Sequence, residues 1–249
     1  MTPSSCVSFE HLFVHDVYDD IAGHFSCTRF TIWPLVTRFL SALSPFSLVS
    51  DVGCGNGKNL IASSSDHIAV GCDISMELCS LARDSIVERD KICDIFHADG
   101  LYTGFKPNIF DATLSIAVIH HFSSSQRRLQ AIQELYRITK PGGKVLISVW
   151  AYGQPKMSKW TPIQIIESRY SPCCASDTQD FIVPWHLRKD FAKKEKVDLF
   201  KKDPRGDLIY GRYYYLFKEN ELDELVQDCG FKIEQSYLEC HNYVVVGVK

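Results

Sequence analysis

Between Phe46 and Trp150, short apolar runs rich in β-branched residues alternate with amphipathic segments. Five of these runs have the length and composition of buried strands: Ser47 to Val52, Ile68 to Ile74, Ile92 to Ala98, Phe110 to Ile119 and Lys144 to Trp150. The intervening segments have helical spacing, most clearly from Ser125 to Thr139, where apolar residues recur at every third position. The alternation predicts an α/β fold with a mostly parallel sheet and right-handed crossovers.

The flanking regions add further elements to this sheet. They are predicted helices at Val14 to Ala22, Trp33 to Leu43 and Glu219 to Cys229, and two strands, Lys232 to Cys240 and Asn242 to Val248, that form an antiparallel hairpin at the sheet edge. The first two helices belong to an N-terminal helical segment, residues 10–45. Residues 151–211 show no sustained period, so we expect an irregular basic insertion within a single domain of residues 1–249.

Composition narrows the class of protein. With 249 residues, 45% hydrophobic and 23% charged, the chain is typical of a globular protein and unlike collagen or a disordered segment. The net charge is −3, yet Trp185 to Arg205 holds eight Lys or Arg against four acids, which makes that stretch +4. Such a stretch either contacts the phosphates of RNA or is a solvated loop.

The ten cysteines and the apolar runs indicate the compartment. No two cysteines form a C-x-x-C pair, and the first residues lack the basic flank and apolar core of a signal peptide. We therefore expect reduced thiols in the cytoplasm or also the nucleus, and no metal site. The longest apolar runs are far shorter than the ~20 residues that span a bilayer, which predicts a soluble protein without a membrane partner.

The first predicted strand leads directly into the loop Asp51-Val52-Gly53-Cys54-Gly55-Asn56-Gly57. Alternate glycines let a backbone approach a ligand more closely than any Cβ allows. A dinucleotide-binding loop has the spacing G-x-G-x-x-G, but Lys58 stands where the third glycine would be. The loop therefore predicts a nucleotide-like ligand other than a dinucleotide.

Three acids at the ends of successive strands specify that ligand. Asp51 can meet an ammonium group, Asp73 two ribose hydroxyls, and Asp99 an adenine amino group. Together they predict S-adenosylmethionine as the cofactor, and this part of the chain resembles the class I S-adenosylmethionine-dependent methyltransferases. That resemblance implies a seven-stranded sheet with an antiparallel last strand and helices on both faces. The candidate cofactor-binding residues are Tyr18, Arg29, Asp51, Gly53, Cys54, Gly55, Asn56, Gly57, Asp73, Ile74, Ala98, Asp99, Gly100, Ala117 and Val118.

Further sequence segments carry a closer resemblance to one family. They are Val14-His15-Asp16-Val17-Tyr18-Asp19, Ile21-Ala22-Gly23-His24-Phe25-Ser26, Trp33-Pro34, Ser115-Ile116-Ala117-Val118-Ile119-His120-His121-Phe122, Val183-Pro184-Trp185-His186 and Arg212-Tyr213-Tyr214-Tyr215-Leu216-Phe217. They resemble the eukaryotic tRNA wobble-uridine carboxymethyl methyltransferases, and the methyltransferase domain of the AlkB-like tRNA hydroxylase is similar. The resemblance implies esterification of the carboxylate of 5-carboxymethyluridine in the tRNA anticodon loop.

Such a reaction requires a carboxylate clamp more than a base, because the acceptor is already an anion at pH 7. The catalytic candidates are His120 and His121, as donors to substrate, and Arg29 and Arg188, as the clamp. Candidates for holding the unstacked base are Trp33, Trp185, Arg212 and Tyr213. The histidines can equally be core residues, the arginines surface charges, and the tyrosines part of a packed strand face.

The strand at 92–98 is expected on an outer edge of the sheet, where unpaired backbone groups invite another chain. The resemblance implies that the partner is the small zinc-binding activator subunit shared by several methyltransferases, docked by strand addition. The alternative is that a loop of this chain covers the edge. Two other functions stay open from sequence: a small-molecule class I methyltransferase, and a non-enzymatic cofactor-binding subunit.

Overall fold

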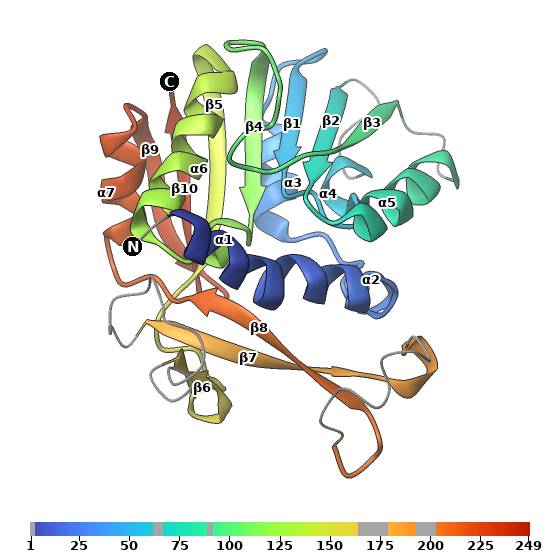
Figure 1. Cartoon of the computed structure of the whole chain (residues 1–249). Coiled ribbons are helices and arrows are strands. Elements are labelled where there is room, and N and C mark those ends of the chain that lie inside the picture. The colour runs from blue at the N-terminus through green and yellow to red at the C-terminus, as the bar shows by residue number, and fades with distance from the viewer. Residues whose placement is uncertain (1–2, 62–66, 89–91, 164–178, 193–202) are drawn as a thin grey trace.

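A computed structural model of the chain describes residues 3–61, 67–88, 92–163, 179–192 and 203–249. Its centre is a seven-stranded sheet with the order β3-β2-β1-β4-β5-β10-β9 (Figure 1). The strands are β1 Leu48–Val52, β2 Ile68–Asp73, β3 Cys93–His97, β4 Phe110–Ile116, β5 Thr139–Trp150, β9 Lys232–Glu239 and β10 Asn242–Val248. The first five pair in parallel, and β10 is antiparallel to both β5 and β9. The predicted fold class is confirmed, including the C-terminal hairpin.

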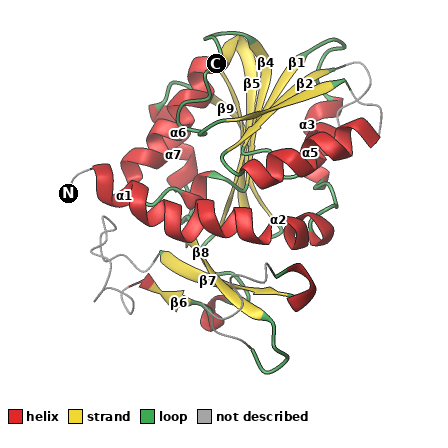
Figure 2. Cartoon of the chain, turned by 45° about the vertical axis from the view of Figure 1, so that its right-hand side comes forward, coloured by secondary structure: helices red, strands yellow, loops and turns green. Residues whose placement is uncertain are grey.

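Helices cover both faces of this sheet (Figure 2). The α-helices of the described residues are α1 Pro3–Glu10, α2 Asp16–Thr28, α3 Pro34–Ser41, α4 Lys58–Ile61, α5 Met76–Glu88, α6 Ser125–Ile138 and α7 Glu221–Asp228. Of these, α1 and α2 run across the carboxyl ends of the strands (Figure 1). Successive residues of a strand point to opposite faces. In β5, Val145 and Ile147 therefore pack in the apolar cluster that includes Ile132 of α6, whereas Leu146 packs with Leu35 of α3. This two-sided burial explains why the central strands are continuous apolar runs.

Several boundaries differ from the prediction. Helix α1 and a five-residue π-helical turn at His11–His15 precede α2, and neither was predicted. Helix α6 begins after Ser124, whose side chain caps it by accepting a hydrogen bond from the backbone of Arg127 at 3.3 Å. It ends at Ile138, and β5 follows at once. The Pro-Gly-Gly sequence therefore lies inside the strand, not before it.

The expectation of an irregular insertion at 151–211 is wrong. This region contributes β6 Thr161–Pro162, β7 Asp180–Leu187 and β8 Leu208–Tyr215, which form a second, antiparallel sheet. No alternation revealed β7, because six of its eight residues are buried on both faces. Its proline, Pro184, pairs with Gly211 of β8 but lies beyond the short pairing with β6, so within the described residues β7 is an edge strand at this position, where proline is tolerated. Much of the basic run, residues 193–202, lies outside the described residues.

Cys6 is disulfide-bonded, which contradicts the expectation that all ten cysteines are reduced; sequence spacing does not reveal which thiols meet in space. Over the ranges given above, no helix is long and apolar enough to cross a bilayer. The same ranges contain no group of three or more His, Cys, Asp or Glu arranged to hold a metal ion.

Candidate functional site

One cavity is lined by residues at the carboxyl ends of the parallel strands, in the N-terminal helices and in β8. Figure 1 shows that α2 and β8 lie beyond this end of the sheet. This is the edge where open α/β sheets bind ligands. Every residue predicted to bind the cofactor lines the cavity except Asp51 and Gly57. Of the other candidates, Trp33, His121 and Arg212 line it, whereas His120, Trp185, Arg188 and Tyr213 do not.

The glycine loop joins β1 to α4 and forms the floor of the cavity. Gly53 has a φ of +80°, which disfavours any residue with a Cβ. A Cβ placed there would lie 2.3 Å from Cγ2 of Val118, on the loop after β4. The N–H groups of Gly53 and Cys54 donate to the carbonyl oxygen of Cys72 at 2.8 and 3.0 Å. The loop is thus held against β2 and packed without spare room.

Two of the three acids face the cavity. Asp73 accepts hydrogen bonds from the backbone N–H groups of Gly55 at 2.8 Å and Ser75 at 2.9 Å, one on each carboxylate oxygen. Burial raises the pKa of this carboxyl. Asp99 accepts the N–H of Leu101 at 2.9 Å through Oδ1. Each carboxylate oxygen can accept a second hydrogen bond, so both acids retain capacity for a ligand.

Asp51 is placed differently from the prediction. It is fully buried beneath the loop and does not line the cavity. Its Oδ2 accepts from Asn59 Nδ2 at 3.2 Å, and its Oδ1 has no hydrogen-bond partner. Burial raises the pKa of the Asp51 carboxyl to about 7. Direct contact with a ligand in this conformation is therefore excluded for Asp51.

Arg212, in β8, places a buried guanidinium at the cavity, and only 6% of the residue is exposed. It lies over the ring of Trp185, 4.7 Å from the centroid, and donates from Nη1 to the hydroxyl of Tyr214 at 2.9 Å. Its Nε has no partner. No acidic side chain of the described residues forms an ion pair with it, whereas buried charges are ordinarily paired. This cation therefore faces the cavity with unused donor capacity.

The hydrogen bonds around Arg212 have a fixed direction. A guanidinium can only donate, and a backbone carbonyl can only accept. Between the Arg212 guanidinium and the Tyr213 carbonyl, the hydroxyl oxygens of Tyr214 and Tyr18 lie 3.2 Å apart, and the Tyr18 hydroxyl lies 3.1 Å from His121 Nε2. His121 Nδ1 lies 2.8 Å from the carbonyl oxygen of Tyr213. His121 must therefore carry its proton on Nδ1 and accept at Nε2. Burial lowers the pKa of His121 to about 3, so the ring is neutral at pH 7.

This arrangement corrects the role predicted for the two histidines. His121 has no free N–H for a substrate, because Nδ1 already donates to the backbone. His120 is fully buried outside the cavity, stacked at 4.9 Å on the ring of Tyr214, and its Nδ1 accepts from the backbone of Trp150 at 3.1 Å. Tyr213 is likewise a core residue, since its hydroxyl donates to Asp180.

The arginine candidates also separate. Arg188 lies outside the cavity, 60% exposed, and pairs with Asp190 two residues along the chain. Arg29 lines the cavity at its exposed rim, with its guanidinium 5.2 Å from the centre of the Trp185 ring. Trp185 therefore supports the two arginines of the cavity, Arg29 and Arg212, and does not line the cavity itself.

Several lining residues were not predicted, among them the polar residues Glu10, His15, Lys58 and Tyr214. Two of them had a signal in the sequence. Lys58 follows the glycine loop directly. Tyr214 stands two residues after Arg212, so Tyr214 and Arg212 face the same side of β8. Glu10 precedes the helix predicted from Val14 and His15 lies within it, but no local pattern indicated that either side chain faces a cavity.

Comparisons with known proteins agree with this geometry. Residues 50–147 match the family described as a methyltransferase domain. The chain is 38% identical to the tRNA (carboxymethyluridine(34)-5-O)-methyltransferase of Schizosaccharomyces pombe, with 98% of this chain and 99% of that protein covered. It is 31% identical to the protein of the same name from Arabidopsis thaliana, covering 97% and 81%. A Xenopus tropicalis relative of that name is 38% identical over 96% of this chain, but the chain spans only 41% of its length.

Solved structures support the fold. A S-adenosylmethionine-dependent methyltransferase from Methanosarcina mazei superposes with a TM-score of 0.64 at 18% identity, covering 88% of this chain and 98% of that one. A putative methyltransferase solved in complex with the Trm112 activator of Haloferax volcanii has a TM-score of 0.60 at 15% identity, covering 94% and 96%. At these identities the likeness concerns the fold alone.

Proposed function

The chain belongs to the tRNA carboxymethyluridine(34)-5-O-methyltransferase family, and from this premise we propose that it methylates the carboxylate of 5-carboxymethyluridine at the wobble position of tRNA. The product is the methyl ester, 5-methoxycarbonylmethyluridine, and the methyl donor is S-adenosylmethionine. The observation that carries the proposal is the buried Arg212 in the cavity, which forms no ion pair with any acid of the described residues and therefore suits a carboxylate substrate. As a tRNA enzyme it is assigned to the cytoplasm, with the nucleus as a second compartment.

The acids and the loop of the cavity fit the cofactor. Asp73 suits two vicinal hydroxyl donors, and Asp99 suits an exocyclic amino group. An acid after the second strand also binds ribose in dinucleotide sites, so it is the spacing of the loop, with Lys58 in place of the third glycine, that disfavours a dinucleotide. Asp51 contributes from beneath the loop, where its hydrogen bond from Asn59 fixes the turn. When bound, S-adenosylmethionine supplies a sulfonium methyl group whose transfer to a carboxylate oxygen leaves a neutral thioether.

Arg212 is assigned as the carboxylate clamp. The fork of a guanidinium holds a carboxylate by two parallel hydrogen bonds, and burial strengthens the pair. The ring of Trp185 behind it and the hydroxyl of Tyr214 beside it fix its plane. With one side of the carboxylate held, an oxygen can be aligned with the methyl group, which is the main demand of a displacement at carbon. Arg188, exposed and paired, is not the clamp.

The reaction needs no general base in this site. The acceptor is a carboxylate and is therefore anionic at pH 7. His121 is neutral and accepts from Tyr18, which in turn lies beside Tyr214 and Arg212. The two tyrosines and the histidine thus orient the clamp through a continuous series of hydrogen bonds.

The proposed reaction has a direct test. Transfer RNA that carries 5-carboxymethyluridine and lacks the methyl ester is incubated with the protein and labelled S-adenosylmethionine, digested to nucleosides, and analysed by mass spectrometry. We expect label in 5-methoxycarbonylmethyluridine. Label in another nucleoside, or transfer only to small molecules, would contradict the proposal.

Contact with the tRNA backbone is assigned to the basic segment, residues 185–205. Arg188, Lys189 and Arg205 are exposed there, and such cations release counterions from phosphates on binding. Lys193, Lys194 and Lys196, which the sequence also suggested, lie outside the described residues.

The edge strand β3 supports an activator partner. It is at one end of the sheet, and Ile92 and Phe96 are 79% and 46% exposed. One part of this edge is already occupied: the backbone of Ile95 accepts from the Arg83 guanidinium at 2.8 Å and donates to Asp94 at 2.8 Å. A partner strand must therefore displace these side chains, or bind chiefly over Ile92 and Phe96. The partner assigned to this edge is the small zinc-binding activator, in a 1:1 complex.

Substitution of the edge tests this assignment. The double change Ile92→Glu with Phe96→Glu should abolish co-purification with the activator, because two charges would be buried in an apolar contact. Phe46→Glu, at a loop residue that is 79% exposed, is the matched control and should leave the complex intact. We also expect the isolated wild-type chain to aggregate and to be poorly active. A monodisperse, fully active monomer in light scattering would disprove the need for a partner.

A further inference from the structure

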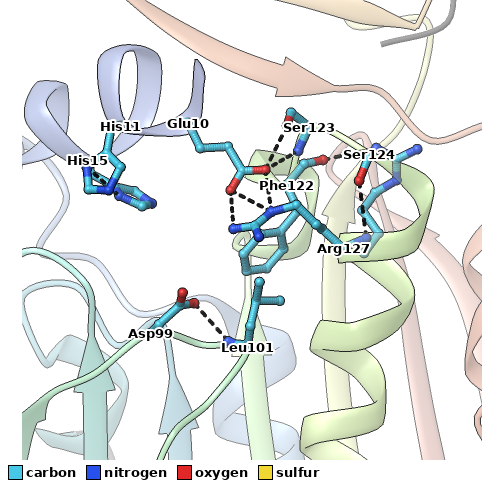
Figure 3. Close-up of polar contacts among 10 residues, drawn as sticks. Glu10, His11, His15, Asp99, Leu101, Phe122, Ser123, Ser124 and Arg127 are labelled. Carbon is cyan, nitrogen blue, oxygen red and sulfur yellow. Dashed lines mark hydrogen bonds and ion pairs between the residues drawn. The ribbon is translucent and has the colours of Figure 1, made fainter. Parts of the chain in front are cut away.

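The N-terminal helix closes the end of the cavity that holds Asp99. His15 lies on the helix above, and Asp99 lies on the loop below (Figure 3). Gly100 and the ring of Phe122 line the same end. This end therefore combines an acid, an imidazole, an apolar ring and a residue without a side chain, which together suit a flat, polar-edged ring.

A π-helical turn determines that His15 faces this space. It spans His11–His15, and the backbone N–H of Asp16 donates to the carbonyl oxygen of His11 across five residues. In a regular α-helix, residues five apart point about 140° away from each other. The wider turn reduces that angle, so both Glu10 and His15 line the cavity. Such turns are rare in helices and are often found at functional sites.

A buried ion pair anchors the helix just before this turn. The Glu10 carboxylate accepts from the backbone N–H and the hydroxyl of Ser123 at 2.7 and 2.8 Å, and from Arg127 Nη2 at 2.7 Å (Figure 3). Glu10 is 1% exposed. Its contacts lie at the amino end of α6, where the helix dipole also favours a carboxylate. These contacts hold the start of the turn against the amino end of α6.

The state of the His15 ring suits a neutral ligand. Burial, followed by the neighbouring His11, lowers its pKa, so the ring is uncharged at pH 7. His11 supports it at an Nδ1 to Nδ1 distance of 3.4 Å, which leaves Nε2 without an assigned protein partner. On the other side, Asp99 has Oδ1 bound to Leu101 and Oδ2 available for an amino group.

We propose that His15 binds the adenine ring of the cofactor from the side opposite Asp99, and that Glu10 is the positioning residue that holds His15 there. This inference rests on the proposed use of S-adenosylmethionine. Besides the acids at the strand ends, the cofactor would then also be bound by a residue of the N-terminal helix.

Calorimetry with two probes tests the contact. S-adenosylhomocysteine contains adenine and the amino-acid chain, whereas 5′-methylthioadenosine lacks the amino-acid chain. His15→Ala should weaken both by the same factor, about tenfold, because one adenine contact is lost from each. Leu12→Ala, at an exposed residue of the same turn, should leave both unchanged.

The outcomes separate this inference from the proposed function. Weakening of neither probe, weakening of S-adenosylhomocysteine alone, or equal weakening by Leu12→Ala would overturn the assignment of His15. If the wild-type protein bound neither probe, the proposed function itself would fail.

A double-mutant cycle tests the role of Glu10. Glu10→Gln should weaken 5′-methylthioadenosine in the wild-type background but have no further effect in the His15→Ala background, because it acts through His15. Equal weakening in both backgrounds would show that Glu10 does not position His15.

Discussion

Arg212→Met lowers the rate of methyl transfer at saturating cofactor by ~100-fold or more and leaves cofactor affinity unchanged. A buried, charge-assisted pair with the substrate carboxylate contributes several kcal/mol, and each 1.4 kcal/mol lost from the transition state costs about tenfold. Arg212→Lys should lose most of the same activity, because an ammonium group cannot form the two parallel hydrogen bonds of the guanidinium. Single-turnover kinetics together with calorimetry of S-adenosylhomocysteine measures both quantities.

Arg188→Ala is the matched control for this experiment. Arg188 is an exposed arginine, 60% accessible and paired with Asp190, and lies outside the cavity. Its loss should leave the single-turnover rate at saturating tRNA within about twofold, since exposed ion pairs contribute little. A normal rate for Arg212→Met, or an equal fall for Arg188→Ala, would contradict the clamp assigned to Arg212.

Asp73→Ala should weaken cofactor binding about thirtyfold, equivalent to ~2 kcal/mol. The substitution removes the acceptor for the ribose hydroxyls and also leaves the N–H groups of Gly55 and Ser75 without their partner. The glycine loop would lose an anchor as well as a ligand contact. Isothermal calorimetry with S-adenosylhomocysteine measures the effect directly.

Asp111→Ala provides the comparison. Asp111 also accepts a backbone N–H, from Leu48 at 2.8 Å, and pairs with Lys140, but it does not line the cavity. Its substitution should lower stability somewhat and leave cofactor affinity unchanged. Unchanged affinity in Asp73→Ala would remove the basis for the cofactor assignment.

Short-range features of the sequence were sufficient to predict the central fold and one side of the site. The strands were recognisable because burial on both faces makes them continuous apolar runs. Asp73 and Asp99 each follow such a run, and parallel strands bring their carboxyl ends to the same edge. Their convergence in one cavity therefore required no knowledge of distant contacts. Asp51 did not follow this rule because its side chain turns beneath the loop.

The other side of the cavity depends on contacts that no local pattern contains. Arg188 and Arg212 are both basic residues near aromatic ones, and only the pairing of β7 with β8 determines that Arg212 faces the cavity. The neutral, accepting state of His121 follows from Tyr18 and Tyr213, which are 103 and 92 residues away.

Sequence alone determined the sheet, the glycine loop and the acids at the strand ends, because each depends on neighbours within a few residues. Only the tertiary structure decided which arginine is buried without an acidic partner in the part of the chain that the structure describes, and which nitrogen of His121 carries the proton. It also placed Glu10 and His15 at the cavity. Those properties are set by burial and by hydrogen bonds between distant segments, and a local sequence pattern specifies neither.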